Sequence, residues 1–118
     1  MASQTVYTQA ATLITASSNS GPLTVGSFAE LAIDINITSK QGTTPTVEFY
    51  IDRLGVDGIY YNIWDSGIVN NTAPTTKSDS IGAGLNVSKS FAGTIQFRWV
   101  IGGSSSTGYV YSVSLQAK

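Results

Sequence analysis

Strict alternation of apolar and polar residues is the feature that most constrains the fold of this chain. In residues 30–38 every second side chain is apolar, and residues 46–52 repeat the pattern after a polar loop that contains Gly42 and Pro45. Successive side chains of a strand point to opposite faces, so a period of two indicates strands with one buried and one wetted face. Two such strands joined by a polar loop predict an antiparallel sheet.

Further strands, separated by turns, are predicted in the rest of the chain. We expect them near residues 5–16, 22–25, 46–54, 59–64, 94–101 and 109–116. The dipeptide Asp57-Gly58 predicts a tight hairpin turn, because both residues tolerate the positive φ of such turns. Residues 70–80 are polar and contain Pro74, so they are interpreted as a surface loop. No segment has the apolar stripe and the caps of a normal helix.

Together these segments predict an all-β fold. We expect a two-sheet antiparallel sandwich of about 7–8 strands, with either a jelly-roll or an Ig-like topology. A chain of 118 residues suffices for one domain with its own core. We expect a flexible N-terminal arm over residues 1–5 and a single sandwich domain over residues 6–118. The expected core residues are Leu31, Ile33, Ile35, Val47, Phe49, Ile51, Ile95, Phe97 and Trp99.

The composition excludes several kinds of chemistry. The chain has no Cys and no His, so disulfides, thiolate catalysis, Ser-His-Asp triads and His-ligated metals cannot be built. Charged residues make up only 11% of the chain, and Ser, Thr, Gly and Asn take their place. This composition is typical of short strands and turns rather than of solvated helices. We therefore expect no enzyme activity and no cofactor.

Acidic residues give no convincing catalytic or metal site. Asp52 and Asp57 could offer two carboxylates to a calcium ion, but their spacing fits no known metal loop and the turn already explains Asp57. Glu30, Asp34 and Glu48 occupy outward positions of strands, where a charge simply solvates the wet face. Glycoside hydrolysis needs two carboxyl groups that face each other across a cleft, and nothing in the sequence indicates one. We expect no metal site.

The charge distribution bears on the class of partner. The net charge is −1, and the six Lys and Arg residues are scattered along the chain, so binding to a phosphate backbone is not expected. The longest apolar run, residues 97–101, contains Arg98 and is far shorter than a membrane-spanning helix. The first residues also lack the pattern of a secretory signal. We expect neither nucleic acid nor a membrane as a partner.

Three aromatic residues lie at the polar positions of neighbouring strands. Tyr50, Tyr60 and Trp64 would expose their rings if the alternation continues without interruption. Exposed rings on a sheet can stack on sugars or anchor a protein interface. The alternative is that one or more of them packs under a loop or against another subunit. These three residues are the candidate binding surface.

The order of strand and turn patterns resembles that of small virion proteins of tailed bacteriophages. The segments that carry the resemblance are residues 15–25, 30–38, 42–49 and 96–103. They cover most of the chain, but each is a strand or turn pattern and none is a catalytic signature. Such proteins are β-sandwiches that decorate or cement capsids, or that belong to tails.

The resemblance implies a non-enzymatic structural protein of the virion, assembled in the host cytoplasm, and a capsid decoration or cement subunit is the first expectation. A tail or baseplate component is one alternative, and a carbohydrate-binding module or adhesin that uses the three aromatic residues is another. The expected partners are further copies of the chain, with a trimer favoured by the resemblance, and the major capsid protein or other virion proteins. A polar arm that includes Ala2, Ser3 and Gln4 could add to a strand edge of a partner.

Overall fold

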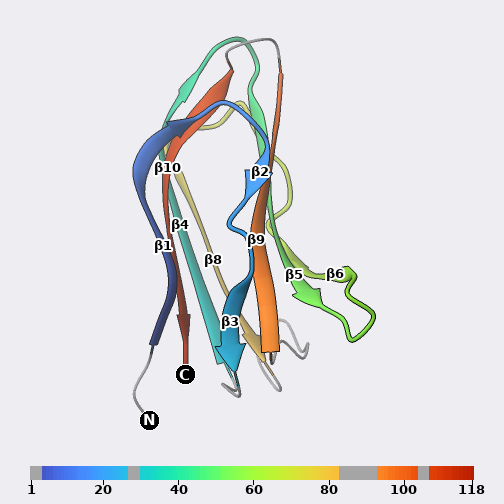
Figure 1. The fold of residues 1–118 in the computed structure, drawn as a ribbon. Helices are drawn as coiled ribbons and strands as arrows, with labels where there is room; N and C mark the ends of the chain where they lie inside the picture. The colour runs from blue at the N-terminus through green and yellow to red at the C-terminus, as the bar shows by residue number, and fades with distance from the viewer. Residues whose placement is uncertain (1–3, 27–29, 83–92, 104–106) are drawn as a thin grey trace.

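The chain folds into a sandwich of two antiparallel sheets that pack face to face (Figure 1). The computed structural model describes residues 4–26, 30–82, 93–103 and 107–118. Within these residues there are ten strands, rather than the expected seven or eight. They are β1 (Gln4–Ile14), β2 (Ser18–Asn19), β3 (Leu23–Gly26), β4 (Glu30–Gln41), β5 (Thr46–Leu54), β6 (Tyr60–Asp65), β7 (Val69–Asn70), β8 (Thr75–Gly82), β9 (Gly93–Gly102) and β10 (Gly108–Ala117).

The strand order identifies the topology as a jelly roll. Sheet A has the order β1-β10-β4-β8, and sheet B has the order β2-β9-β5-β6, with β3 on β9 and β7 on β5. Strands β2 and β3 both pair with β9, and β6 and β7 both pair with β5, so each couple counts as one interrupted strand. The eight resulting strands pair in a nested order: β1 with β10, β2 and β3 with β9, β4 with β8, and β5 with β6 and β7. This nesting is the jelly-roll arrangement. An Ig-like sandwich would place the first two strands in one sheet, whereas β1 and β2 lie in different sheets.

The core between the sheets confirms the alternation found in the sequence. All nine residues expected in the core are buried. Phe49 lies at the centre, where its ring is 5.8 Å from that of Phe97 in the same sheet and 4.9 Å from that of Tyr111 in the other. Tyr109 and Tyr111 are also fully buried, so the last strand contributes large side chains to the core. The side chains between the two sheets therefore form one continuous apolar core.

Strand β8 forms where the sequence predicted a loop. It pairs with β4 from Glu30 opposite Gly82 to Ile37 opposite Thr75. The only large apolar side chain in β8 is that of Ile81, which is buried. An edge strand has one paired side and can expose much of its surface, so its sequence need not alternate strictly. The prediction of a loop over residues 70–80 is therefore wrong for the part that β8 occupies.

The N-terminal boundary of the domain also differs from the prediction. Strand β1 begins at Gln4, which lies opposite Ala117, and Thr5 lies opposite Gln116. Both residues belong to sheet A, because they are part of the antiparallel ladder with β10. The prediction of an arm over residues 1–5 is wrong for these two residues, and Ala2 and Ser3 lie outside the described residues.

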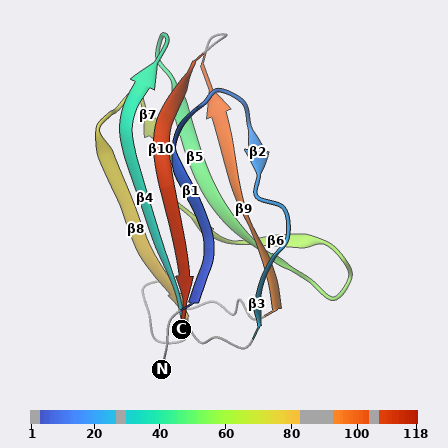
Figure 2. The ribbon, with the colours of Figure 1, turned by 60° about the vertical axis from the view of Figure 1, so that its left-hand side comes forward.

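The hairpin between β5 and β6 extends away from the sandwich in both views (Figure 1, Figure 2). The pairing of β5 with β9 ends at Arg53 opposite Ile95, whereas the pairing with β6 continues to Leu54 opposite Tyr60. Beyond this point the two arms of the hairpin have only each other. Side chains there have no second sheet to pack against, whichever face of the strand they occupy.

Candidate functional site

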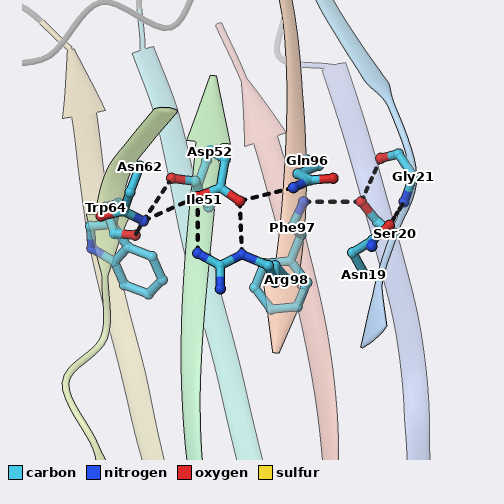
Figure 3. A network of polar contacts seen from close by, with 10 residues as sticks. All are labelled: Asn19, Ser20, Gly21, Ile51, Asp52, Asn62, Trp64, Gln96, Phe97 and Arg98. Carbon is cyan, nitrogen blue, oxygen red and sulfur yellow. Dashed lines mark hydrogen bonds and ion pairs between the residues drawn. The ribbon is translucent and has the colours of Figure 1, made fainter. Parts of the chain in front are cut away.

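The outer face of sheet B carries a polar network centred on the carboxylate of Asp52 (Figure 3). Arg98 binds both carboxylate oxygens, from Nε to Oδ2 at 2.9 Å and from Nη2 to Oδ1 at 3.2 Å. Gln96 donates to Oδ2 at 2.9 Å, and Asn62 donates to Oδ1 at 3.2 Å. The donors come from β9 on one side of β5 and from β6 on the other, so the network ties three strands together.

Burial and hydrogen bonding act in opposite directions on Asp52. Burial by itself would raise the pKa of this carboxyl, but the bonds from Arg98, Gln96 and Asn62 outweigh it and hold the pKa below the ordinary value of 3.8. The hydrogen bond to Asp52 also raises the pKa of Arg98. Both groups are therefore charged at neutral pH. A carboxylate held by four donors is a structural clamp, not a proton-transfer group.

Tyr50 lies beside this network but does not offer a free ring. The guanidinium carbon of Arg98 is 4.0 Å from the centre of the Tyr50 ring, which places the cation over one face of the ring. A hydrogen bond with Glu48 raises the pKa of Tyr50. Burial, followed by a hydrogen bond with Asp65, raises the pKa of Glu48. Tyr50 therefore lies between the guanidinium of Arg98 and the carboxyl group of Glu48.

Trp64 lies in the core, so the prediction that its ring faces outward is wrong. Its exposed fraction is 4%, and its indole nitrogen donates to Asp79 Oδ2 at 2.8 Å. The cause is a β-bulge: Trp64 lies opposite Ile51, but the next pair is Asn62 opposite Asp52, so Ile63 is an extra residue. The bulge turns the Trp64 side chain from the outer to the inner face.

The three aromatic residues predicted from the sequence therefore do not form one surface. Tyr50 is half-buried beneath Arg98, and Trp64 is inside the sandwich. Tyr60 is half-buried and lies opposite Leu54, at the base of the projecting hairpin. No flat platform of rings for a sugar is formed by these three side chains.

The tip of the β5–β6 hairpin exposes apolar side chains that the sequence reasoning did not select. Val56 is fully exposed, and Ile59 and Tyr61 have exposed fractions of 56% and 46%. In the alternation of residues 59–64, Ile59 and Tyr61 fall on the same side as Ile63, which is buried. Ile59 and Tyr61 are nevertheless exposed, because the hairpin projects from the sandwich (Figure 1). The exposure of Val56 could have been predicted from the sequence, because this apolar residue lies between Gly55 and the turn dipeptide Asp57-Gly58.

Several hydrogen bonds hold the hairpin tip in one conformation. The Gly55 amide donates to the Ile59 carbonyl oxygen at 2.7 Å, and the Gly58 amide donates to the Gly55 carbonyl oxygen at 3.0 Å. Asp57 accepts from the Ile59 amide at 3.1 Å and from the Tyr61 hydroxyl at 2.6 Å. The bond from Tyr61 lowers the pKa of Asp57, so this carboxylate stays charged into the acidic range. The apolar side chains are thus presented by a braced turn.

The described residues contain neither a cluster of metal-ligating side chains nor a helix that could span a membrane. No three or more acidic side chains gather in this part of the chain where they could hold a metal ion. Asp52 and Asp57, the two carboxylates considered for calcium, each have their own set of hydrogen-bond partners. No helix long and apolar enough to cross a membrane occurs in residues 4–26, 30–82, 93–103 or 107–118.

No protein-family model, no curated protein and no solved structure matches this chain.

Proposed function

We propose that this protein is a non-enzymatic structural subunit of a tailed-phage virion that docks through the tip of its β5–β6 hairpin. A capsid decoration or cement subunit is the first form of this proposal. The observation that carries it is the exposure of Val56, Ile59 and Tyr61 on a braced, projecting turn. Apolar and aromatic side chains that are already ordered lose little entropy when a partner buries them, and such residues dominate protein interfaces.

The remaining features support a structural role in a general way. The sandwich has a self-sufficient apolar core, and the Asp52–Arg98 ion pair joins neighbouring strands of sheet B. The virion part of the proposal is supported by the resemblance of the strand and turn patterns in the sequence. A tail or baseplate component would use the same docking chemistry, and electron microscopy of assembled particles distinguishes the two locations.

The proposed partners follow from the same surface. The hairpin would dock on the major capsid protein or another virion protein, and further copies of the chain would form a homo-oligomer, with a trimer favoured. Light scattering of the free protein and of the protein on particles tests the oligomer. The N-terminal arm remains in the proposal only as far as Ala2 and Ser3, because Gln4 already belongs to β1.

The proposal is tested by removing the apolar surface without touching the turn. The double variant Val56→Ser and Ile59→Ser keeps Gly55, Asp57 and the backbone hydrogen bonds of the turn. Its binding to undecorated particles is measured by co-sedimentation, with its melting temperature as a check on folding. We expect binding at least about tenfold weaker, which corresponds to about 1.4 kcal/mol, at an unchanged melting temperature.

A matched control comes from the body of the sandwich. Val100 is 41% exposed on the outer face of sheet B, away from the hairpin, so Val100→Ser should bind particles as the unaltered protein does. Equal binding by the hairpin variant and the Val100 variant would reject the hairpin as the docking element. Binding to tails but not to capsids would keep the docking surface and reject the decoration role.

A further inference from the structure

The outer face of sheet A contains a groove that the proposed docking role does not use. Its volume is about 390 Å³, and it runs over the three neighbouring strands β10, β4 and β8. The lining residues that carry the argument are Asp34, Asn36, Thr76, Ser78, Ser112 and Ser114. This volume lies within the range of small-ligand sites, about 300–1,000 Å³.

The register of the strands places these six side chains in two rows. One row runs Ser114, Asp34, Ser78 across β10, β4 and β8, because each residue lies directly opposite the next. The second row, two residues along each strand, runs Ser112, Asn36, Thr76. Side chains two apart on a strand share a face, so the six form a grid of about 4.8 Å across strands and about 7 Å along them.

The polar side chains of this grid have no hydrogen-bond partners within the described part of the chain. None of the six takes part in the side-chain hydrogen bonds or ion pairs of the described residues. The outer face of sheet B is the opposite case, because Asp52, Asn62 and Gln96 bind one another or Arg98. One face of the sandwich therefore satisfies its own polar groups, and the other presents them to solvent.

We propose that the groove on sheet A binds a neutral carbohydrate chain. A sugar presents hydroxyls that both donate and accept, and the grid offers a carboxylate that accepts, an amide that does both, and four rotatable hydroxyls. Asp34 and Asn36 are planar groups that can each bind two adjacent sugar hydroxyls. The site goes beyond the proposed docking role, since it lies on the sheet that does not carry the hairpin.

Other classes of ligand fit the groove less well. Among its lining residues, Asp34 is the charged side chain on the face of the grid, because Lys77 lies opposite the inward-facing Ile35. The groove therefore lacks the excess of cations that a phosphate or a sulfated ligand needs. Its apolar lining residues, Ile35 and Val113, are 2% and 3% exposed, so the groove offers no apolar anchor for a protein hot spot. The accessible lining is more apolar than polar in area, although the side chains of the grid end in hydroxyl, amide and carboxylate groups. A neutral glycan offers both kinds of contact, because its C–H faces are apolar and its hydroxyls donate and accept.

The test is binding of the purified protein to an array of neutral oligosaccharides, namely glucans, mannans, galactans and N-acetylhexosamine oligomers, with sulfated glycans included. The strongest ligand is then titrated by calorimetry. We expect binding to a neutral oligosaccharide that becomes at least about tenfold weaker in the double variant Asp34→Ala and Asn36→Ala. Thr24→Ala, an exposed change on β3 of sheet B, should leave binding unchanged.

Each other outcome overturns the proposal. Absence of binding to every neutral oligosaccharide at millimolar concentration rejects it, as does binding that the double variant retains at an unchanged melting temperature. A preference for sulfated glycans rejects a neutral ligand. Loss of particle binding in the groove variant, without any glycan binding, would make the groove a protein interface instead. The Val56→Ser and Ile59→Ser variant should bind the glycan normally, so failure of the docking proposal stays distinguishable from failure of this one.

Discussion

The indole nitrogen of Trp64 donates a hydrogen bond to Asp79 Oδ2 at 2.8 Å, and this contact joins the edges of the two sheets. Trp64 lies on β6 of sheet B, and Asp79 lies on β8 of sheet A. A buried indole N–H needs an acceptor, because an unpaired polar group in a core costs about 1–3 kcal/mol. The polar sequence of β8 supplies that acceptor.

We predict that Trp64→Phe lowers the free energy of unfolding by roughly 2–4 kcal/mol. The change removes a hydrogen bond to a charged acceptor and part of a buried ring. Trp99→Phe is the matched control, because its indole is also buried but donates to the neutral carbonyl oxygen of Ala16 at 3.0 Å. Urea unfolding should show the larger loss for Trp64. Equal losses would show that the charge of Asp79 adds nothing.

We predict that the contribution of Asp52 to stability disappears in acid. Its pKa lies below the ordinary value in the folded chain, so the unfolded chain binds more protons as the pH falls. The stabilisation is therefore complete above the unfolded pKa and is lost as the pH falls below the ordinary value of 3.8 and through the folded pKa.

The measurement for Asp52 is urea unfolding of the unaltered protein and of Asp52→Asn from neutral to acid pH. At neutral pH the variant should be less stable by roughly 1–3 kcal/mol, less than for a fully buried pair because the Arg98 side chain is 33% exposed. The difference should shrink towards acid pH. Asp34→Asn, a change in a carboxylate outside the network, serves as the control. A difference that stays constant with pH would refute the role given to the charge.

We predict that Phe97→Ala costs roughly 3–5 kcal/mol of unfolding free energy. The ring is fully buried, and it lies 5.8 Å from the rings of both Tyr7 and Phe49 and 5.9 Å from that of Trp99. Val100→Ala, on the outer face of the same strand, should change stability by less than about 0.5 kcal/mol because its side chain is 41% exposed. A loss below 1 kcal/mol for Phe97→Ala would show that the cavity collapses or that the ring is not central to the core.

We predict that Gly55→Ala loosens the hairpin tip without unfolding the sandwich. A Cβ at this position would lie 2.7 Å from Asp57 Oδ1 and 2.8 Å from Cε2 of Tyr61, so the brace between those two side chains must shift. Gly58→Asn is the control, because the Cβ would meet nothing within 4 Å and Asn tolerates a positive φ.

Amide hydrogen exchange measures this effect. Exchange of the amides of residues 55 and 58 should accelerate in Gly55→Ala, while amides of β9 and β10 keep their protection and the melting temperature falls little. Weaker binding of this variant to particles would connect the rigidity of the hairpin with docking. Unchanged exchange would show that the turn absorbs the methyl group.

Much of the fold could be predicted from the sequence, because apolar residues at every second position show which side chains of a strand face the core. The strand over residues 46–54 was predicted with the bounds that β5 has, and its apolar positions Val47, Phe49 and Ile51 are buried. The same period placed Ile95, Phe97 and Trp99 inside. A strand in the middle of a sheet with one dry face must alternate, so the pattern is readable wherever both neighbours are present.

The sequence by itself determined the all-β class, the central strands and the inner face of the sandwich. Tertiary structure decided the edges: an inserted residue at Ile63 turned Trp64 inward, and pairing with β4 made a strand of residues 75–82, most of which are polar. It also left Ile59 exposed, since the second sheet does not reach the hairpin, and it buried Asp52 beneath Arg98. Alternation reports only which face a side chain takes, whereas burial depends on what lies opposite that face, and only the packing of distant strands supplies it.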